Sequence, residues 1–237
     1  ANWEPQHVFL ATMFLPLTVT LGAFWIQEER GIQSPFKTTL APLEQCFRML
    51  KTSNLKWFLG ILIISTVPAA FGVPFFFHMK EKLGFTETYL GALISLGWAG
   101  AIIGSLLYAK WLKQYPAKLT LKWAIIINSI NIFSTLLISN ERTAFILIFI
   151  GGVMGVLTML PIMSTSAVLT HGSMVEGTLF AVLMSLYNLA QIIFGFVGGK
   201  AFDWMGLVPF ICVTGVIALT ALFFVGKLEL DSAEAYK

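Results

Sequence analysis

The residues best suited to chemistry lie within one largely apolar run. The segment MVEGTLFAVLMSLYNLAQ, residues 174–191, places Glu176 near its start and Ser185, Asn188 and Gln191 further along. A spacing of three residues puts these last three along one face of a helix. Polar side chains that face lipid lose hydrogen bonds, so this face must meet another helix or a wet cavity. Interhelical bonding and contact with a solute both fit the pattern.

Glu176 is a separate case because it carries a charge. A charged side chain at the centre of a membrane helix costs a few kcal/mol, roughly 3 on insertion scales. At the start of a helix, however, a carboxylate is stabilised by unpaired backbone N–H groups and by the helix dipole. We therefore expect a helix cap or a loop contact, with a role in proton coupling as the alternative.

Two further apolar runs contribute candidate side chains. One holds Thr158 and Ser164 on either side of Pro161, whose ring removes a backbone hydrogen bond and can kink a helix. That kink is either a moving gate or a static bend. The other run holds Trp98, whose indole suits stacking on a flat heterocycle but also suits ordinary packing. With Ser185, Asn188 and Gln191, these residues form the predicted substrate-binding set.

The elements that must position these residues are membrane helices. Hydrophobic residues make up 57% of the 237-residue chain and charged ones 11%, and the mean hydropathy is +0.82. Repeated apolar runs approach the roughly 20 residues that a helix needs to cross a bilayer, and barrel-type alternation is absent. We predict an all-α membrane protein with about seven spans: residues 7–27, 55–78, 88–111, 119–139, 143–169, 177–202 and 208–227.

These spans divide the chain into four parts: a first transmembrane helix at 1–28, an inner loop at 29–54, a six-helix bundle at 55–228 and a polar tail at 229–237. In the loop, Leu43, Phe47 and Leu50 recur at helical spacing, which predicts an amphipathic helix, either in the membrane interface or solvated. The first residues, ANWEPQH, are polar, so we expect no signal peptide.

Positive charges predict the orientation and the partners of the chain. Lys and Arg concentrate in the loop at 28–54, in the loop near 110–122 and at the C-terminus. The positive-inside rule places these segments on the cytoplasmic or stromal side of an unidentified membrane. The default partner of such residues is the lipid headgroup, and no basic stripe predicts a nucleic-acid site.

Small residues predict where helices touch. Three pairs with the Gly-xxx-Gly spacing lie in separate spans, and such pairs let helix backbones approach closely in lipid. We predict packing contacts at all three, with sliding of the same spans during function as the alternative. The pairs are Gly100 with Gly104, Gly151 with Gly155, and Gly195 with Gly199.

The histidines and cysteines give little indication of a metal site or a catalytic site. His78 and His171 lie near span ends and are weak candidates as ligands of a metal or of a chlorophyll magnesium. Cys46 and Cys212 are far apart and lack metal-type spacing. The chain shows no nucleophile with its base and no phosphate-binding loop, so we expect no enzyme and assign no cofactor.

Three segments carry a resemblance to a known family. They are KLGFTETYLG at 82–91, the Leu-Pro pair at 160–161 and EGTLFAVLMSLYN at 176–188. They resemble the C-terminal half of the folate-biopterin transporter family, within the major facilitator superfamily. The resemblance implies that the first span corresponds to helix six of such a transporter, the loop to its central loop and the remaining spans to helices seven to twelve.

The same resemblance implies a function. A substrate cavity would lie between two six-helix halves and open alternately to either side, so this chain would transport a small organic solute only with a complementary half. The resemblance leads us to look for a carboxylate at 69–77 and a basic residue near 166–168, and neither is present. The alternative is therefore a non-transporting structural subunit of a larger, for example photosynthetic, complex that binds other membrane subunits, lipid or chlorophyll.

Overall fold

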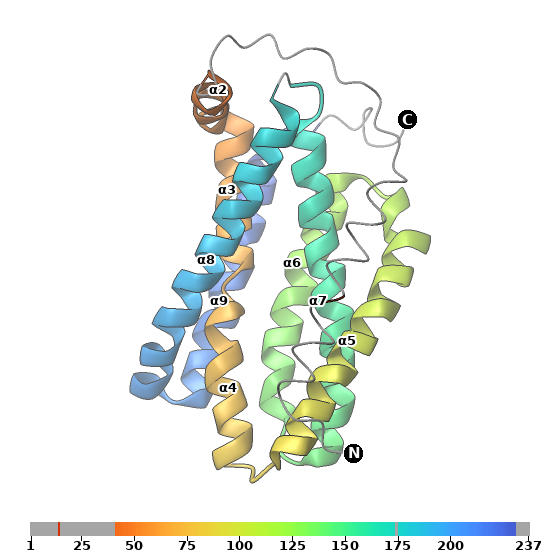
Figure 1. Ribbon diagram of the computed structural model, residues 1–237, viewed down its shortest axis with the longest axis vertical. Coiled ribbons are helices and arrows are strands. Elements are labelled where there is room, and N and C mark those ends of the chain that lie inside the picture. Colours follow the sequence, from red (N-terminus) through yellow and green to blue (C-terminus); the bar gives the residue numbers. More distant parts are fainter. Residues whose placement is uncertain (1–13, 15–40, 174, 231–237) are drawn as a thin grey trace. The chain divides into compact units, whose positions relative to one another are not determined.

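The structure of the chain is a computed structural model that describes residue 14 and residues 41–173 and 175–230 (Figure 1). The helices below all lie in one compact unit, Leu40–Lys237. The described ranges contain helices and connecting turns and no strand. The elements are α2 (Ala41–Leu50), α3 (Ser53–Ser65), α4 (Ala69–Glu81), α5 (Glu87–Lys110), η1 (Leu112–Gln114), α6 (Ala117–Ser134), η2 (Thr135–Leu137), α7 (Glu141–Thr170), α8 (Glu176–Met205) and α9 (Leu207–Lys227).

Six helical stretches of the described chain are long and apolar enough to cross a membrane, which confirms the all-α membrane fold. The predicted span at 7–27 lies, apart from residue 14, outside the described residues. The other six predicted spans each coincide with an observed stretch. These stretches are Ser53–Glu81, Glu87–Gln114, Ala117–Leu137, Glu141–Thr170, Glu176–Met205 and Leu207–Lys227.

The span predicted as one helix at 55–78 is broken in its middle. Helix α3 ends at Ser65, a turn follows, and α4 begins at Ala69 after Pro68. Proline has no N–H to donate to the carbonyl four residues back, and its ring crowds that carbonyl, so a proline inside a helix kinks or interrupts it. The amides of Val67 and Ala69 instead bond the carbonyls three residues back, at 3.1 and 2.9 Å. Pro161, by contrast, lies inside α7, which continues through it.

The helices pack as two groups, which meet mainly where α6 contacts α9. Helix α5 packs most extensively against α7, and α4 packs against α8. Helices α6 and α9 pack against each other, with α6 also lying on α7 and α9 on α3 (Figure 1). Near the end that holds the α4–α5 turn, Phe71 stacks on Phe75 at 4.6 Å and on Phe210 of α9 at 6.4 Å. These rings form part of a buried core that fixes α4 against α9.

Local signals set the ends of the helices. Thr86 accepts a hydrogen bond from the Tyr89 amide at 3.2 Å and so caps α5. Asn140 and Thr143 form a reciprocal capping box at the start of α7. Gly206 alone joins α8 to α9, with a φ of +76°, a left-handed conformation that glycine adopts without a steric cost. These caps allow consecutive spans to reverse direction within a few residues.

Helix α2 forms where the amphipathic connector was predicted. Cys46 is only 1% exposed, while Leu43 and Phe47 on another side of the helix are exposed. Helix α2 contacts α8 and α3. Its exposed apolar side chains suit an interface, but the depth of α2 in a membrane and the orientation of the chain both stay predictions.

Candidate functional site

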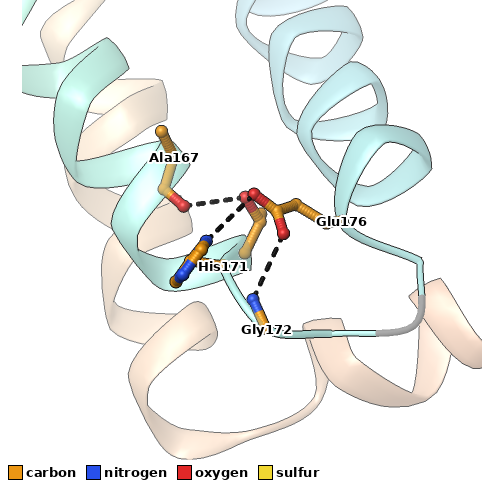
Figure 2. A network of polar contacts seen from close by, with 5 residues as sticks. Ala167, His171, Gly172 and Glu176 are labelled. Atoms are coloured by element: carbon orange, nitrogen blue, oxygen red, sulfur yellow. Dashed lines mark hydrogen bonds and ion pairs between the residues drawn. The ribbon is translucent and has the colours of Figure 1, made fainter. Parts of the chain in front are cut away.

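The carboxylate of Glu176 lies in the turn between α7 and α8 (Figure 2). Its Oε2 accepts a hydrogen bond from the Gly172 amide at 3.2 Å, and its Oε1 lies 3.3 Å from Nδ1 of His171. The side chain of His171 is largely exposed, and that of Glu176 is about half exposed. Because both of these contacts are to the turn itself, the carboxylate closes the loop between two spans. The geometry favours the loop contact over the coupling role.

The polar face of α8 is uncovered in the described part of the chain. Ser185 is exposed, and its hydroxyl donates only to the Ala181 carbonyl of its own helix at 2.8 Å. Asn188, near the middle of α8, is also exposed and has no hydrogen bond to any described residue. Gln191 is half-buried, and its side chain lies close to that of Tyr187 on the same helix. The described helices therefore do not provide the interhelical partners that the bonding alternative requires.

The candidates on α7 face a different environment. Thr158 is 7% exposed, and its hydroxyl lies 3.2 Å from the Ala124 carbonyl of α6 and 3.0 Å from the Met154 carbonyl. This side chain therefore ties α7 to α6. Ser164 is half-buried and has no side-chain hydrogen bond within the described ranges. Of the two, only Ser164 keeps a hydroxyl free for another partner.

Trp98 is separated from the α8 candidates by the packing of its helix. Its side chain is 71% exposed near the middle of α5. Helix α5 packs mainly on α7, whereas α8 packs mainly on α4. The structure thus distributes the predicted binding residues over three helices and leaves Trp98, Ser185 and Asn188 uncovered.

The three predicted glycine pairs differ in how closely they meet a neighbouring helix. A Cβ atom added at Gly100 would overlap the Phe149 carbonyl, and one at Gly104 would come within 2.6 Å of the Val153 carbonyl. These two glycines lie directly against α7. A Cβ at Gly151 would lie 3.1 Å from the Asn131 amide oxygen, and one at Gly155 would meet nothing within 4 Å.

The closest backbone approaches occur at two glycines outside the predicted pairs, each adjacent in sequence to a predicted glycine. At Gly152 a Cβ would overlap the Gly97 backbone, and at Gly198 it would overlap the Ala70 backbone. A Cβ at Gly195 would lie 3.8 Å from the Ala69 carbonyl, and one at Gly199 would meet nothing within 4 Å. The signal that was available is the double glycine at 151–152 and 198–199, where either residue can supply the contact.

Within the described ranges, no group of three or more His, Cys, Asp or Glu is arranged to hold a metal ion. His171 faces Glu176, as described above. His78 lines a cleft of about 690 Å³ between the ends of α4 and α8, together with Glu81, Lys82 and Asp203. Sequence reasoning missed this cleft. The available signal was Asp203, a carboxylate just beyond the predicted end of the sixth span.

Comparison with known proteins agrees with this architecture. Residues 4–228 match the sequence profile described as the BT1 family. The chain is 28% identical over 248 residues to a folate-biopterin transporter of Synechocystis, covering 95% of this chain and 49% of that protein. It is 25% identical over 201 residues to folate transporter 2 of Plasmodium falciparum, covering 79% and 43%. The chain thus spans about half the length of the curated relatives it matches.

Proposed function

This chain belongs to the BT1 family, and from that membership we propose that it forms one half of a membrane transporter for a small organic solute. The relatives named above are folate or folate-biopterin transporters. We propose a solute of the same class, a flat heterocycle with hydrogen-bonding groups. Transport would proceed by alternating access, with a complementary six-helix half in the same polypeptide or in a second one closing the cavity.

The observation that carries the proposal is the uncovered amide of Asn188. It lies near the middle of a 30-residue apolar helix and has no hydrogen-bonding partner among the described residues. A bare amide in hydrocarbon loses hydrogen bonds worth roughly 1–3 kcal/mol by protein mutational measures. Water in a cavity, a bound solute or the complementary half would restore these bonds. A solute-lined face is therefore the environment that suits this side chain.

We assign different roles to the remaining candidates. Ser185 and Gln191 flank Asn188 on α8 and extend the binding face, and Trp98 and Ser164 supply contacts from α5 and α7. Thr158 is a packing residue because its hydroxyl is already bonded to α6. Glu176 holds the α7–α8 turn rather than coupling an ion. The binding face itself therefore contains no charged side chain, so charges for an anionic solute would come from the complementary half.

Uptake by membranes that contain the chain and its complementary half tests the proposal. Asn188→Leu removes the amide but keeps the number and branching of the side-chain heavy atoms, so uptake of a folate or pterin tracer should be lost while the amount of folded protein stays unchanged. Thr220→Val is the matched control, because that hydroxyl is exposed on α9 and bonds only the Ile217 carbonyl of its own helix. Unchanged uptake by Asn188→Leu would remove this residue from the site.

The structural-subunit hypothesis makes a different prediction for the native particle. A transporter half should be recovered in mild detergent with one complementary six-helix half and little else. A large assembly with many other subunits or pigments would contradict the transport proposal. The polar face of α8 would then bind neighbouring helices, and Asn188→Leu would disturb assembly instead of uptake.

A further inference from the structure

A second hollow lies where α2 meets α3, at the end of the unit opposite the α4–α5 turn (Figure 1). It has a volume of about 390 Å³ and is distinct from the polar face of α8. The rings of Trp57 and Phe224, 5.8 Å apart, form its apolar side. Lys51, Ser53 and Lys56 form its polar side. A hollow with adjoining cationic and aromatic sides suits an amphipathic anion.

The two lysines in this hollow have no counter-ion among the described residues. Neither Lys51 nor Lys56 has an ion pair or side-chain hydrogen bond within the described ranges. Two other basic residues at the same end are engaged: Arg48 pairs with Glu44 at 2.7 Å, and the Lys118 ammonium donates to the Leu228 carbonyl at 2.6 Å. Two ammonium groups that line one hollow repel each other, and an anion between them reduces that repulsion.

The surrounding backbone adds to this positive potential. Helix α3 begins at this hollow, and its first turn contains no acidic residue. The Thr52 hydroxyl donates to the Met49 carbonyl at 2.7 Å and gives α3 no side-chain cap. Asn54 exchanges two hydrogen bonds with the backbone of Glu229, at 2.7 and 3.2 Å. This exchange fixes the segment after α9 against α3 and so preserves the shape of the hollow.

We propose that the hollow binds the phosphate group of an anionic phospholipid through Lys51 and Lys56. The Trp57–Phe224 ring pair then contacts the adjoining glycerol and acyl carbons, as aromatic residues do at the headgroup level. A soluble phosphate offers the same anionic group but nothing to place on the rings. This site serves lipid binding and is independent of the proposed transport cavity.

Tryptophan quenching tests the proposal on the full 237-residue chain. The purified protein is titrated in mixed micelles with phosphatidylglycerol that carries brominated acyl chains, and separately with brominated phosphatidylcholine. We expect saturable quenching by the anionic lipid at low mole fraction, and its loss in Trp57→Phe. The double variant Lys51→Gln/Lys56→Gln should bind about thirtyfold more weakly, because each lysine near an anionic surface contributes about fivefold.

Matched variants separate a pocket from general surface charge. Lys113→Gln/Lys122→Gln removes two exposed lysines from the same end of the bundle and should leave the titration unchanged. Lys51→Arg/Lys56→Arg keeps both charges and should restore binding. Equal losses in the two Gln double variants, or no preference for the anionic lipid, would overturn the proposal.

Inorganic phosphate distinguishes the two sources of the anion. Millimolar phosphate should not displace the brominated lipid, because it makes no contact with the aromatic pair. Displacement that depends on Lys51 and Lys56 would overturn the lipid assignment and identify a soluble phosphate as the occupant.

Discussion

The α5–α7 contact and the polar face of α8 are built from similarly apolar spans. The first is closely packed, whereas the second is not covered by any described helix. Across the first, glycines bring the two backbones together, and Gly100, Gly104 and Gly152 have no room for a side chain. On the second, Ser185 and Asn188 face outward without an interhelical partner in the described chain. In a membrane, where apolar side chains gain little from leaving lipid, close packing of small residues holds helices together. An uncovered polar face in the described bundle therefore requires another explanation, which the proposed binding role would supply.

The largest effect is expected where the closed contact is tightest. Gly152→Ala places a methyl group against the Gly97 backbone, which cannot move aside as a flexible side chain can. We expect destabilisation of at least about 2 kcal/mol, toward the upper part of the range for overpacked cores. Thermal unfolding in detergent, followed by loss of the monodisperse particle, measures it.

Gly155→Ala is the control for this change, three residues away on the same helix with open space around the added methyl group. It should be neutral or stabilise the helix by up to about 1 kcal/mol, since alanine is the better helix former. Equal destabilisation by both changes would mean that the two helices do not meet at Gly152.

Thiol accessibility tests whether the open face is wet. In a chain with Cys46→Ala and Cys212→Ser, we expect Asn188→Cys to react with a membrane-impermeant maleimide roughly tenfold or more faster than Thr220→Cys, because the hydrated thiolate is the reactive species. Mass spectrometry of the labelled protein in intact vesicles gives the rates. Similar slow rates at both positions would place Asn188 against lipid or protein and remove the distinction between the two regions.

A smaller effect is expected for the hydrogen bond that helps close the α6–α7 contact. Thr158→Val removes the hydroxyl that bonds the Ala124 carbonyl and should cost about 0.6 to 1 kcal/mol, the usual worth of such bonds between membrane helices. Thr220→Val removes only an intrahelical bond and should cost less. If Thr158→Val abolished uptake without a change in stability, Thr158 would belong to the binding face after all.

The smallest effect is expected for the alkylation rate of Cys46, which lies on the buried side of α2. This residue extends the comparison of covered and uncovered faces to a helix outside the six spans. Burial raises the pKa of the Cys46 thiol above its ordinary value, so less thiolate is present near neutral pH. In a Cys212→Ser chain, alkylation of Cys46 should be slower in the folded protein than in the same chain unfolded by a denaturing detergent. In the folded protein the alkylation rate should keep rising as the pH is raised above the ordinary thiol pKa of about 8.5. Coincident rate profiles for the folded and unfolded chains would show that α2 leaves Cys46 exposed.

The sequence by itself determined the membrane class and the six described spans after residue 50, because hydropathy and helix length are local properties of the chain. It also placed Glu176 at a helix end, where the structure finds it bonded to its own turn. Tertiary structure decided which glycines contact a neighbouring helix. A small rotation of a helix about its axis would bring Gly151 instead of Gly152, or Gly199 instead of Gly198, to the contact. It also separated Thr158, whose hydroxyl is held by α6, from Asn188, whose amide has no partner among the described residues. Both residues are polar groups in apolar helices, and only the position of the neighbouring backbone tells a packing contact from a face that is open for binding.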